Sequence, residues 1–576
     1  MFASLKKLKM KKRTNFIYII LSMLLLSGCY EMDKYPLDQL SSATFWQNET
    51  QVHEGIMGVY QTLKNRDVFG IKFMTDSRTD IGIGYDWQSY PGLNDGSMTS
   101  NTAWVDYKWT DCYDGIAQAN NFIMNVTKMT DDQIDSSTKS VYIGEARFLR
   151  AVFYNELLNF FGGVPIYDET TDVSVEFNTM LKARSTADEV RTFILDDLQA
   201  AIDILPVSWD DAEKGRVGRS AAYAMRGRVE LYNKDYESAI ADFEEVVKPE
   251  YGHELYSDYA GLFLPGGDES SEMIFAIQNM GGVGVDNGMQ FGRYLGTRAS
   301  YGSCWDNGMP SVELVNMYET TDGNDIDWDA IFPGFSGSDD VKKAVFESSL
   351  SEDLTTVIKY PDEINKLKDL YASLDPRCAA TVITPYSEYL GWVSNEAKMC
   401  TWVLASGTKE SNGFIRHNRS WYCYLWRKFV PAGNMDGQIN SRDDVPINYP
   451  VIRLADVYLM MAECYNELEQ QGNAITYINM VRSRVNMPGI TETTKDDIFT
   501  RIVRERAVEL AGEGLRYNDL VRWRLAGEKI NGKTARELTG EKLYDTTFDE
   551  NSNYLYPIPY TEIEKNPTLT QNPGWE

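Results

Sequence analysis

The sequence predicts a mainly α-helical protein, in which tetratricopeptide-like helix pairs form a scaffold and a loop-rich region carrying short strands is inserted between them. Apolar residues recur at helical spacing over much of residues 40–270, and two segments match the tetratricopeptide pattern of about 34 residues. Between them, residues 271–447 become rich in Gly, Asp, Asn and Trp. The chain has 576 residues, more than one hydrophobic core usually supports, so we expect either two lobes or a repeat-built domain with large insertions.

Two segments of the first half carry clear helical signals. Residues 145–161 place apolar side chains at helical spacing, and two glycines and Pro165 follow them. Thr186 and Glu189 have the spacing of a capping box, ahead of an apolar face that ends at Pro206. We therefore expect one helix to end near residue 161 and a second to begin just after Thr186.

Two helix pairs fit the tetratricopeptide pattern, in which small residues let two helices approach and rings fill the gap between neighbouring pairs. The first pair departs from the pattern at Glu230, where Tyr is usual. The matched positions are Tyr223, Gly227, Ala239, Phe243 and Val246 in the first pair, and Tyr458, Ala462, Tyr465, Ala474, Ile478 and Val481 in the second. Because a long stretch separates the pairs, we expect an interrupted array rather than a continuous solenoid.

The N-terminus has the pattern of a lipoprotein export signal. Lys6 to Arg13 form a basic leader, and Phe16 to Leu26 form an apolar run that is too short to span a bilayer. The following Leu-Ser-Gly-Cys, which ends at Cys29, looks like a bacterial lipobox. Cys29 is then the lipid-bearing first residue of the mature chain; the alternative is an ordinary secretory signal with an incidental cysteine.

These patterns give the expected organisation of the chain. The divisions are a signal peptide at 1–28, a helical region at 29–270, and a C-terminal region at 271–576 that comprises a loop-rich part at about 271–447, helical units at about 448–530 and an extended tail to 576. Met273 to Ile277 reads as a buried strand, and the four prolines after residue 556 forbid a long helix in the tail.

Charge and composition exclude several classes of protein. Acidic residues outnumber basic residues by 85 to 56, for a net charge of −29, so we expect no nucleic-acid partner. The three histidines lie far apart and no CxxC occurs, so we expect no zinc site, thiol redox site or cofactor. We expect buried small residues at Cys112, Cys304, Cys378, Cys400, Cys423 and Cys464.

Catalytic motifs are missing from the sequence. No GxSxG, HExxH or phosphate-binding glycine loop is present, and we expect that the protein is not an enzyme. Two well-placed carboxylates suffice for glycoside hydrolysis, so a glycosidase remains open. The spacing of Asp322, Asp325, Asp327 and Asp329 departs from a calcium-binding EF-hand loop, and we expect a solvated turn there rather than a metal site.

Several segments, taken in order, resemble the RagB/SusD family of outer-membrane nutrient-uptake lipoproteins. They are YPLDQLSSATFW (35–46), WTDCYDGIAQANNFI (109–123), EARFLRAVFYNELLNFFGGVPI (145–166), RSTADEVRTFILDDLQAAIDILP (184–206), RLADVYLMMAECYNE (453–467) and RIVRERAVELAGEGLRYNDLVRW (501–523). The resemblance implies a lipid anchor in the outer membrane and a SusC-like TonB-dependent transporter as partner, on which the protein acts as a hinged lid. Glu31 and Asp33 resemble the acidic signal for outward display.

The resemblance also implies a cargo, for which we expect an oligosaccharide or polysaccharide. A sugar ring offers an apolar C–H face and a fringe of hydroxyls, so its site needs flat rings with polar groups at their edges. Two loop clusters meet this need: Tyr85, Trp87 and Tyr90 with Asn94, and Tyr294, Tyr301 and Trp305 with Asn307. The alternative is that these rings anchor loops to the scaffold.

The remaining aromatic and charged candidates divide as follows. We expect packing roles for Trp46, Trp109, Trp523 and Trp575, while Trp392, Trp402, Trp421 and Trp426 stay open between packing and binding. The run RIVRER at 501–506 is expected to form ion pairs that hold the last helices together. Capture of peptides by the same architecture and hydrolysis of surface glycans are the alternatives to glycan capture.

Overall fold

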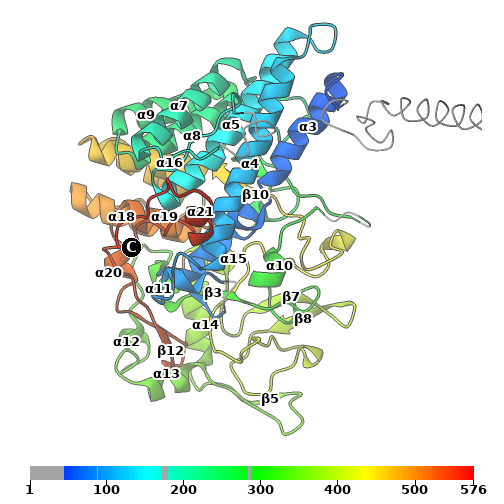
Figure 1. Ribbon diagram of the computed structural model, residues 1–576. Coiled ribbons are helices and arrows are strands. Elements are labelled where there is room, and N and C mark those ends of the chain that lie inside the picture. The colour runs from blue at the N-terminus through cyan, green and yellow to red at the C-terminus, as the bar shows by residue number, and fades with distance from the viewer. Residues whose placement is uncertain (1–44, 87–88, 172–179, 283, 285–286, 576) are drawn as a thin grey trace, which may run out of the picture.

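The computed structural model of the chain is mainly α-helical, which confirms the predicted fold class (Figure 1). It describes residues 45–86, 89–171, 180–282, 284 and 287–575. The predicted signal peptide, Cys29, Glu31, Asp33 and Trp87 lie outside these ranges. No helix in the described part of the chain is both long enough and apolar enough to cross a membrane.

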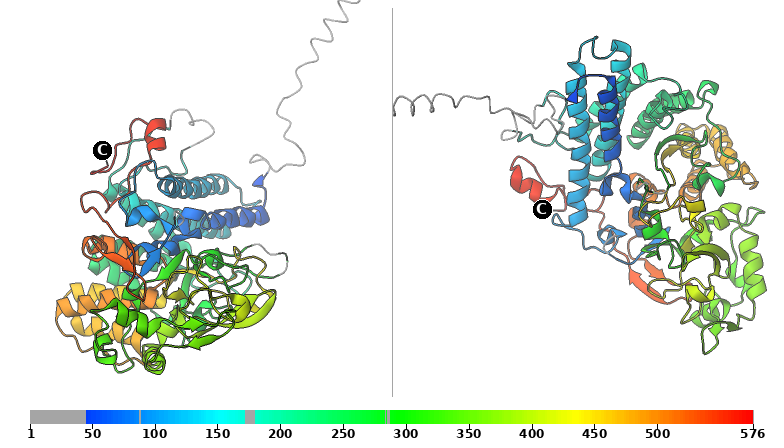
Figure 2. Two further views of the ribbon diagram at one scale, coloured as in Figure 1. Left: turned by 90° about the horizontal axis from the view of Figure 1, so that it is seen from below. Right: turned by 90° about the vertical axis from the view of Figure 1, so that its right-hand side faces the viewer.

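The long helices gather on one side of the molecule, and the loop-rich region covers the other (Figure 2). The helices before that region are α3 (Glu49–Thr62), α4 (Ala103–Thr127), α5 (Ser136–Phe161), α7 (Ala187–Ile204), α8 (Arg219–Tyr232) and α9 (Tyr236–Val246). Those after it are α16 (Leu454–Glu467), α17 (Gln471–Ser483), α18 (Lys495–Leu510), α19 (Arg516–Arg522) and α20 (Ala526–Lys529).

Capping explains where two of these helices begin. The capping box of Thr186 and Glu189 is present at the start of α7, as predicted. Helix α5 begins at Ser136, earlier than the predicted 145, because the Asp135 side chain accepts hydrogen bonds from the backbone of residues 137 and 138. The first turns of α5 are polar, so apolar periodicity does not reveal them.

The two predicted helix pairs are present and lie side by side (Figure 1). Helices α8 and α9 approach closely at Gly227, where a Cβ atom would lie only 2.7 Å from the Phe243 ring. In the second pair, the Tyr465 ring of α16 stacks on the Tyr477 ring of α17 with centroids 5.7 Å apart. Tyr465 also donates a hydrogen bond to Glu244 of α9 at 2.6 Å. The array that is interrupted in sequence is therefore continuous in space.

Two antiparallel strands fix where the loop-rich region leaves and rejoins the scaffold. Strand β2 (Met273–Ile277), which the sequence predicts, pairs with β10 (Tyr449–Arg453), and Ile277 lies opposite Tyr449. Residues 278–448, hereafter the insert, thus begin and end at neighbouring points of one small sheet.

The insert contains the expected short strands, together with short helices that the sequence pattern does not predict. The strands are β3 (Gly308–Pro310), β4 (Ser349–Leu350), β5 (Val357–Lys359), β6 (Val382–Ile383), β7 (Glu388–Val393), β8 (Glu396–Thr401) and β9 (Leu425–Trp426). The helices are α10 (Phe291–Leu295), α11 (Val312–Met317), α12 (Trp328–Ile331), α13 (Asp339–Phe346), α14 (Ile364–Ala372) and α15 (Pro376–Thr381). Most are too short to show helical periodicity.

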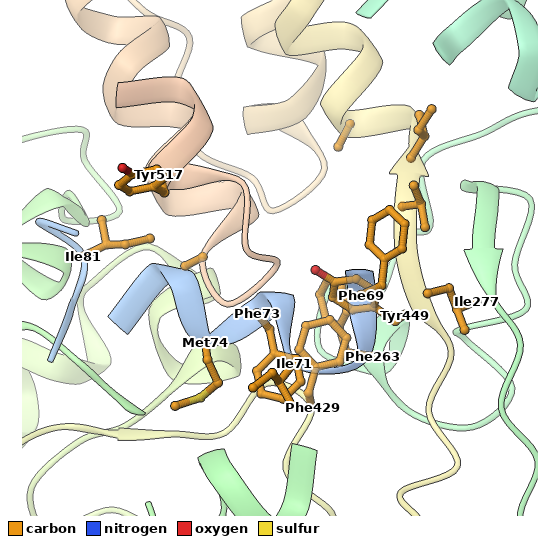
Figure 3. Packing of buried hydrophobic residues seen from close by; sticks show 14 of the residues in the cluster. Phe69, Ile71, Phe73, Met74, Ile81, Phe263, Ile277, Phe429, Tyr449 and Tyr517 are labelled. Carbon is orange, nitrogen blue, oxygen red and sulfur yellow. The ribbon is translucent and has the colours of Figure 1, made fainter. Parts of the chain in front are cut away.

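An aromatic core joins the insert to the scaffold (Figure 3). The Phe291 ring stacks on the Phe429 ring with centroids 4.6 Å apart, and both belong to the insert. Phe73, from the 3-10 helix Lys72–Arg78, lies 4.8 Å from Phe291, and Tyr449 of β10 lies 5.9 Å from it. Because each fully buried ring of this size stabilises the fold by about 1.5–3 kcal/mol, the insert is anchored firmly.

The run at 501–506 forms ion pairs inside the scaffold, as predicted. Arg506 contacts Asp456 of α16 at 2.7 Å, and both side chains are buried. Glu509, on the same helix, faces three guanidinium groups at 2.5 to 2.9 Å, those of Arg377, Arg453 and Arg484. Burial alone would raise the pKa of Glu509, but these three cations outweigh it and hold the pKa well below its usual range.

The tail is less extended than the sequence predicts. It contains a hairpin of β11 (Thr534–Arg536) and β12 (Lys542–Asp545) and a short helix, α21 (Tyr560–Lys565). Its backbone packs on α5, since Tyr556 N donates to Phe160 O at 2.6 Å.

The six cysteines of the described ranges are buried free thiols.

Candidate ligand-binding site

A short ladder brings the two predicted loop clusters together. Strand β1 (Gly82–Gly84) pairs antiparallel with β3, so Tyr85, which follows β1, lies beside Asn307, which precedes β3. Tyr85 N donates to Asn307 O at 3.3 Å, and the Tyr85 hydroxyl donates to Trp305 O at 3.0 Å. Glycine is required in this ladder, because a Cβ atom at Gly82 would lie 2.3 Å from a backbone carbonyl oxygen.

A third segment, residues 417–421, completes the surroundings of Tyr85. The Trp421 ring meets the Tyr85 ring edge-on at 5.7 Å, and the Arg419 guanidinium lies 4.8 Å from the centre of the Tyr85 ring. Asn418 Nδ2 donates to the Tyr85 hydroxyl at 2.7 Å. Tyr85 and Trp421 are both half-buried, which leaves part of each ring accessible.

His417 fixes the shape of this third segment. Its Nδ1 accepts hydrogen bonds from the backbone N–H groups of Arg419 (3.0 Å) and Trp421 (3.2 Å), so the ring proton must sit on Nε2. Nε2 lies 3.7 Å from Asp306 Oδ2, which would be an ion pair only with a protonated ring. Burial lowers the pKa of His417 to about 3, so the ring is neutral, and it stacks on Trp421 at 5.8 Å.

Trp305 and Tyr301 lie in a second group of rings and cations. The guanidinium groups of Arg293 and Arg442 lie 4.9 and 4.8 Å from the centre of the Trp305 ring, within the range of cation–π attraction. Tyr301 stacks on Trp392 with centroids 6.1 Å apart. All three rings are half-buried, so this group extends the aromatic cluster along the insert.

Four other predicted residues are interior. Tyr90 is 5% exposed, and its hydroxyl donates to Asp67 Oδ1 at 2.8 Å. Asn94 is 2% exposed and accepts a hydrogen bond from Arg78 at 3.3 Å. Tyr294 and Asn307 are also buried. These four side chains make internal contacts and do not present a face to a ligand. They take the alternative role stated above, in which the rings anchor loops to the scaffold.

A cavity of about 610 Å³ lies beyond the segment 417–421. Its aromatic lining includes Trp421 and Tyr422, which are half-buried, and Trp402, which is buried. Two acidic residues, Glu537 and Glu541, approach it from the tail. Burial raises the pKa of Glu537 above its usual value. The cavity and the aromatic cluster are contiguous, because His417, Arg419 and Trp421 belong to both.

The remaining candidates have structural roles. Trp402 and Trp426, left open by the sequence, are buried, and Trp46, Trp109, Trp523 and Trp575 pack on neighbouring elements as expected. Among the residues that the structure describes, no cluster of three or more His, Cys, Asp or Glu is arranged to hold a metal ion. In the acidic segment, Asp325 pairs with Arg504 at 2.6 Å and Asp327 caps α12.

Comparison with known proteins identifies the family. The SusD family model matches residues 271–575, and a second family, described as starch-binding associating with outer membrane, matches residues 32–231. A SusD-like protein of Formosa agariphila is 25% identical over 96% of this chain and 98% of its own length. The starch-binding protein SusD of Bacteroides thetaiotaomicron is 25% identical over 85% of this chain and 82% of its own.

A solved structure agrees with these matches. The crystal structure of a SusD-like protein from Bacteroides fragilis has a TM-score of 0.74 and 26% sequence identity, and the match covers 94% of this chain and 100% of that one. The similarity therefore includes the scaffold and the insert. Since the SusD family model spans more than half of the residues and the solved structure shares the fold over 94% of the chain, this chain belongs to the SusD family.

Proposed function

We propose that this protein captures oligosaccharides outside the cell and delivers them to a SusC-like TonB-dependent transporter. The observation that carries the proposal is the cluster of half-buried rings that includes Tyr85, Trp305 and Trp421, of which Trp421 lines a cavity of about 610 Å³. Such rings offer apolar surface to the C–H face of a sugar, and amide and guanidinium groups at their edges donate to its hydroxyls. The starch-binding description of the second family and the starch-binding relative support this ligand class.

The role proposed for the site is binding without chemical change. Cargo that must be handed to a transporter should dissociate readily, so we expect dissociation constants between about 1 mM and 1 μM, or about −4 to −8 kcal/mol. Rings that are already held by neighbouring side chains lose little conformational freedom on binding, which favours recognition of a sugar surface at this modest affinity.

A panel of polysaccharides in native affinity electrophoresis tests the binding role. We expect retention by at least one polysaccharide, and a loss of about ten-fold in affinity in the Trp421→Ala and Trp305→Ala variants, because each removes apolar contact area. The Trp87→Ala variant tests whether Trp87, which the sequence predicts to bind the ligand and which lies outside the described residues, contributes to retention.

Trp209→Ala is the matched control for these variants. Trp209 is also half-buried, but it lies between α7 and α8, where its Nε1 donates to Val217 O at 3.0 Å. Retention that is the same in the wild type, Trp421→Ala and Trp305→Ala would show that the site is elsewhere. No retention on any polysaccharide would refute glycan capture, and binding of a peptide mixture in the same assay would favour the alternative cargo.

The proposed location is the outer membrane, with a lipid on Cys29 and the protein facing outward. The support is the lipobox pattern at Cys29, the acidic residues that follow it, and the outer-membrane description of the second family. Radioactive palmitate should label the wild type and leave Cys29→Ala unlabelled, and protease added to intact cells should degrade the wild type. Labelling of Cys29→Ala, or a protected wild type, would contradict this location.

A surface glycosidase is the second candidate, because two carboxylates line the same cavity. Glu537 has a raised pKa, as a general acid requires, and Glu541 lies nearby on the same hairpin loop. A reducing-end assay on the bound polysaccharide distinguishes the two roles. We expect no release; release that Glu537→Gln abolishes would establish the enzyme instead.

A further inference from the structure

The cavity beside the aromatic cluster has a charge opposite to that of the chain as a whole. Four basic side chains line it, those of Lys409, Arg416, Arg419 and Lys542, against the two carboxyl groups of Glu537 and Glu541. In the whole chain, acidic residues outnumber basic ones by 85 to 56. The basic residues gathered here come from two distant segments, 409–419 of the insert and the β11–β12 hairpin of the tail. Basic side chains therefore outnumber acidic ones among the residues that line the cavity, in contrast to the chain as a whole.

Two of the four cations have no carboxylate partner among the described residues. The Arg419 side chain is exposed, and its guanidinium lies 4.8 Å from the centre of the Tyr85 ring. Lys409 forms no ion pair in the described ranges. By contrast, Arg416 pairs with Glu410 at 3.1 Å and Lys542 with Asp545 at 2.5 Å. Arg419 and Lys409 are thus the cations with free donors for a ligand.

The position of Arg419 links the charged cavity to the rings. Its guanidinium lies over Tyr85, its own backbone N–H is held by His417, and the residue also lines the cavity. A guanidinium presents a planar fork of N–H donors that matches the paired oxygens of a carboxylate or a sulfate ester. A sugar that packs on Tyr85 and Trp421 would place a charged substituent within reach of this fork.

We propose that the cavity is a subsite for an anionic substituent, a carboxylate or a sulfate ester, carried by the captured oligosaccharide. This inference rests on the glycan-capture function proposed above and names the class of glycan: uronic-acid-containing or sulfated rather than neutral. Arg419 and Lys409 bind the anion, and the adjacent rings bind the sugar. Because both cations are accessible to water, salt should weaken the charged contribution and leave the stacking contribution in place.

Pairs of polysaccharides that share a backbone and differ in charge test this inference. The carboxylate arm compares de-esterified with fully methyl-esterified homogalacturonan, and the sulfate arm compares native with desulfated carrageenan. The full chain, purified in detergent, is measured by biolayer interferometry. We expect the acidic member of at least one pair to bind at least about ten-fold more tightly than its neutral partner in 0.15 M salt, and the arm that responds identifies the substituent.

Two variants distinguish a specific anion-binding subsite from nonspecific electrostatic attraction between the protein and an acidic polysaccharide. Arg419→Gln should lower the affinity for the acidic polysaccharide by about ten-fold and reduce the preference for the acidic over the neutral member of the pair. Lys128→Gln, which removes one exposed cation just after α4 on the helical side, should leave both affinities unchanged. Acid preference that survives Arg419→Gln, or that Lys128→Gln reduces equally, overturns the inference.

The proposed function and this inference fail in different ways. If the protein binds only neutral polysaccharides, glycan capture stands and the anionic subsite is refuted. If it binds no polysaccharide of either kind, glycan capture fails and the subsite fails with it.

Discussion

The scaffold and the candidate site differ in whether their positively charged side chains have carboxylate partners. Around Glu509 in the scaffold, buried guanidinium groups are matched by carboxylates, and three arginines converge within 2.9 Å. The buried Arg78 donates instead to uncharged oxygens of Ser89 and Asn94. At the site, Arg419 lies over an aromatic ring and faces solvent without a carboxylate partner in the described ranges. A buried charge must be paired because its desolvation is costly, whereas an accessible cation can remain available. Pairing therefore distinguishes charges that hold the fold from charges that can meet a ligand.

The tryptophans of the scaffold and of the insert differ in a similar way, in how far their rings are buried. Trp104 and Trp109 of α4 are 6% and 4% exposed and pack on other rings of the scaffold. Trp305, Trp392 and Trp421 of the insert remain half-buried, although each also contacts a ring or a cation. Rings held on one side and accessible on another are suited to binding, since little entropy is lost in ordering them.

Removing the central carboxylate of the scaffold should have the largest effect. Glu509→Gln leaves Arg453 and its neighbours buried without their full countercharge, so the free energy of unfolding should fall by about 3–5 kcal/mol. Urea denaturation at neutral pH measures this loss. Glu269→Gln is the control, because Glu269 pairs with Lys214 at the surface and should contribute about 0–1 kcal/mol. Similar losses in the two variants would contradict the distinction between paired interior and surface charge.

Acid should weaken a second buried ion group by a smaller amount. Glu156 receives hydrogen bonds from Lys72 and Lys108, each at 2.5 Å. Burial opposes its ionisation, but Lys108 and Lys72 outweigh burial and lower its pKa from 4.5 to about 2. Because the folded pKa is lower than the unfolded one, this stabilisation is complete above pH 4.5 and is lost as pH falls towards 2.

The pH-dependent difference between wild type and Glu156→Gln isolates this contribution. The variant should be less stable at pH 6, and the gap should narrow by about 2 kcal/mol at pH 3, because Glu156 takes up a proton in the unfolded wild type while it stays largely ionised in the folded one. Urea denaturation of both proteins at the two pH values gives the change. A gap that stays constant would mean that the Glu156 carboxylate is not held ionised by the two lysines.

The smallest effect is expected for the stability of Arg419→Gln. This side chain is exposed and forms no ion pair in the described part of the chain, so the free energy of unfolding should change by less than about 0.5 kcal/mol. Thermal and urea denaturation, run on the same preparation as the binding assays, measure it. A loss of several kcal/mol would place Arg419 with the structural charges and would make any change in its binding uninformative.

The sequence predicts the scaffold well because its signals are local and periodic. The capping box at Thr186, the small residue at Gly227 and the strand at 273–277 each follow from neighbouring residues. The sequence does not predict the early start of α5, because the first turns of this helix carry no apolar pattern. The sequence does not predict the short helices of the insert for a similar reason, since a helix such as α12, with four residues, shows no helical periodicity.

The site was predictable only in part, because its residues meet through the fold. The loop context of Tyr85 and Trp305 predicts them as ligand-binding residues, and the β1–β3 ladder places Tyr85 beside the Trp305 backbone. Tyr90 has the same context but turns inward to Asp67. Nothing in the local sequence shows that Arg419 lies over Tyr85, since the two are more than three hundred residues apart. Long-range contacts of this kind leave no periodic signature.

The pairing of β2 with β10 has a consequence for how such a protein can diversify. The two ends of the insert meet on one small sheet, so substitutions or length changes between them need not shift the stacked helices. Most walls of the candidate pocket come from that same segment. The ligand preference can consequently change through substitutions in the insert, while the helical scaffold stays the same.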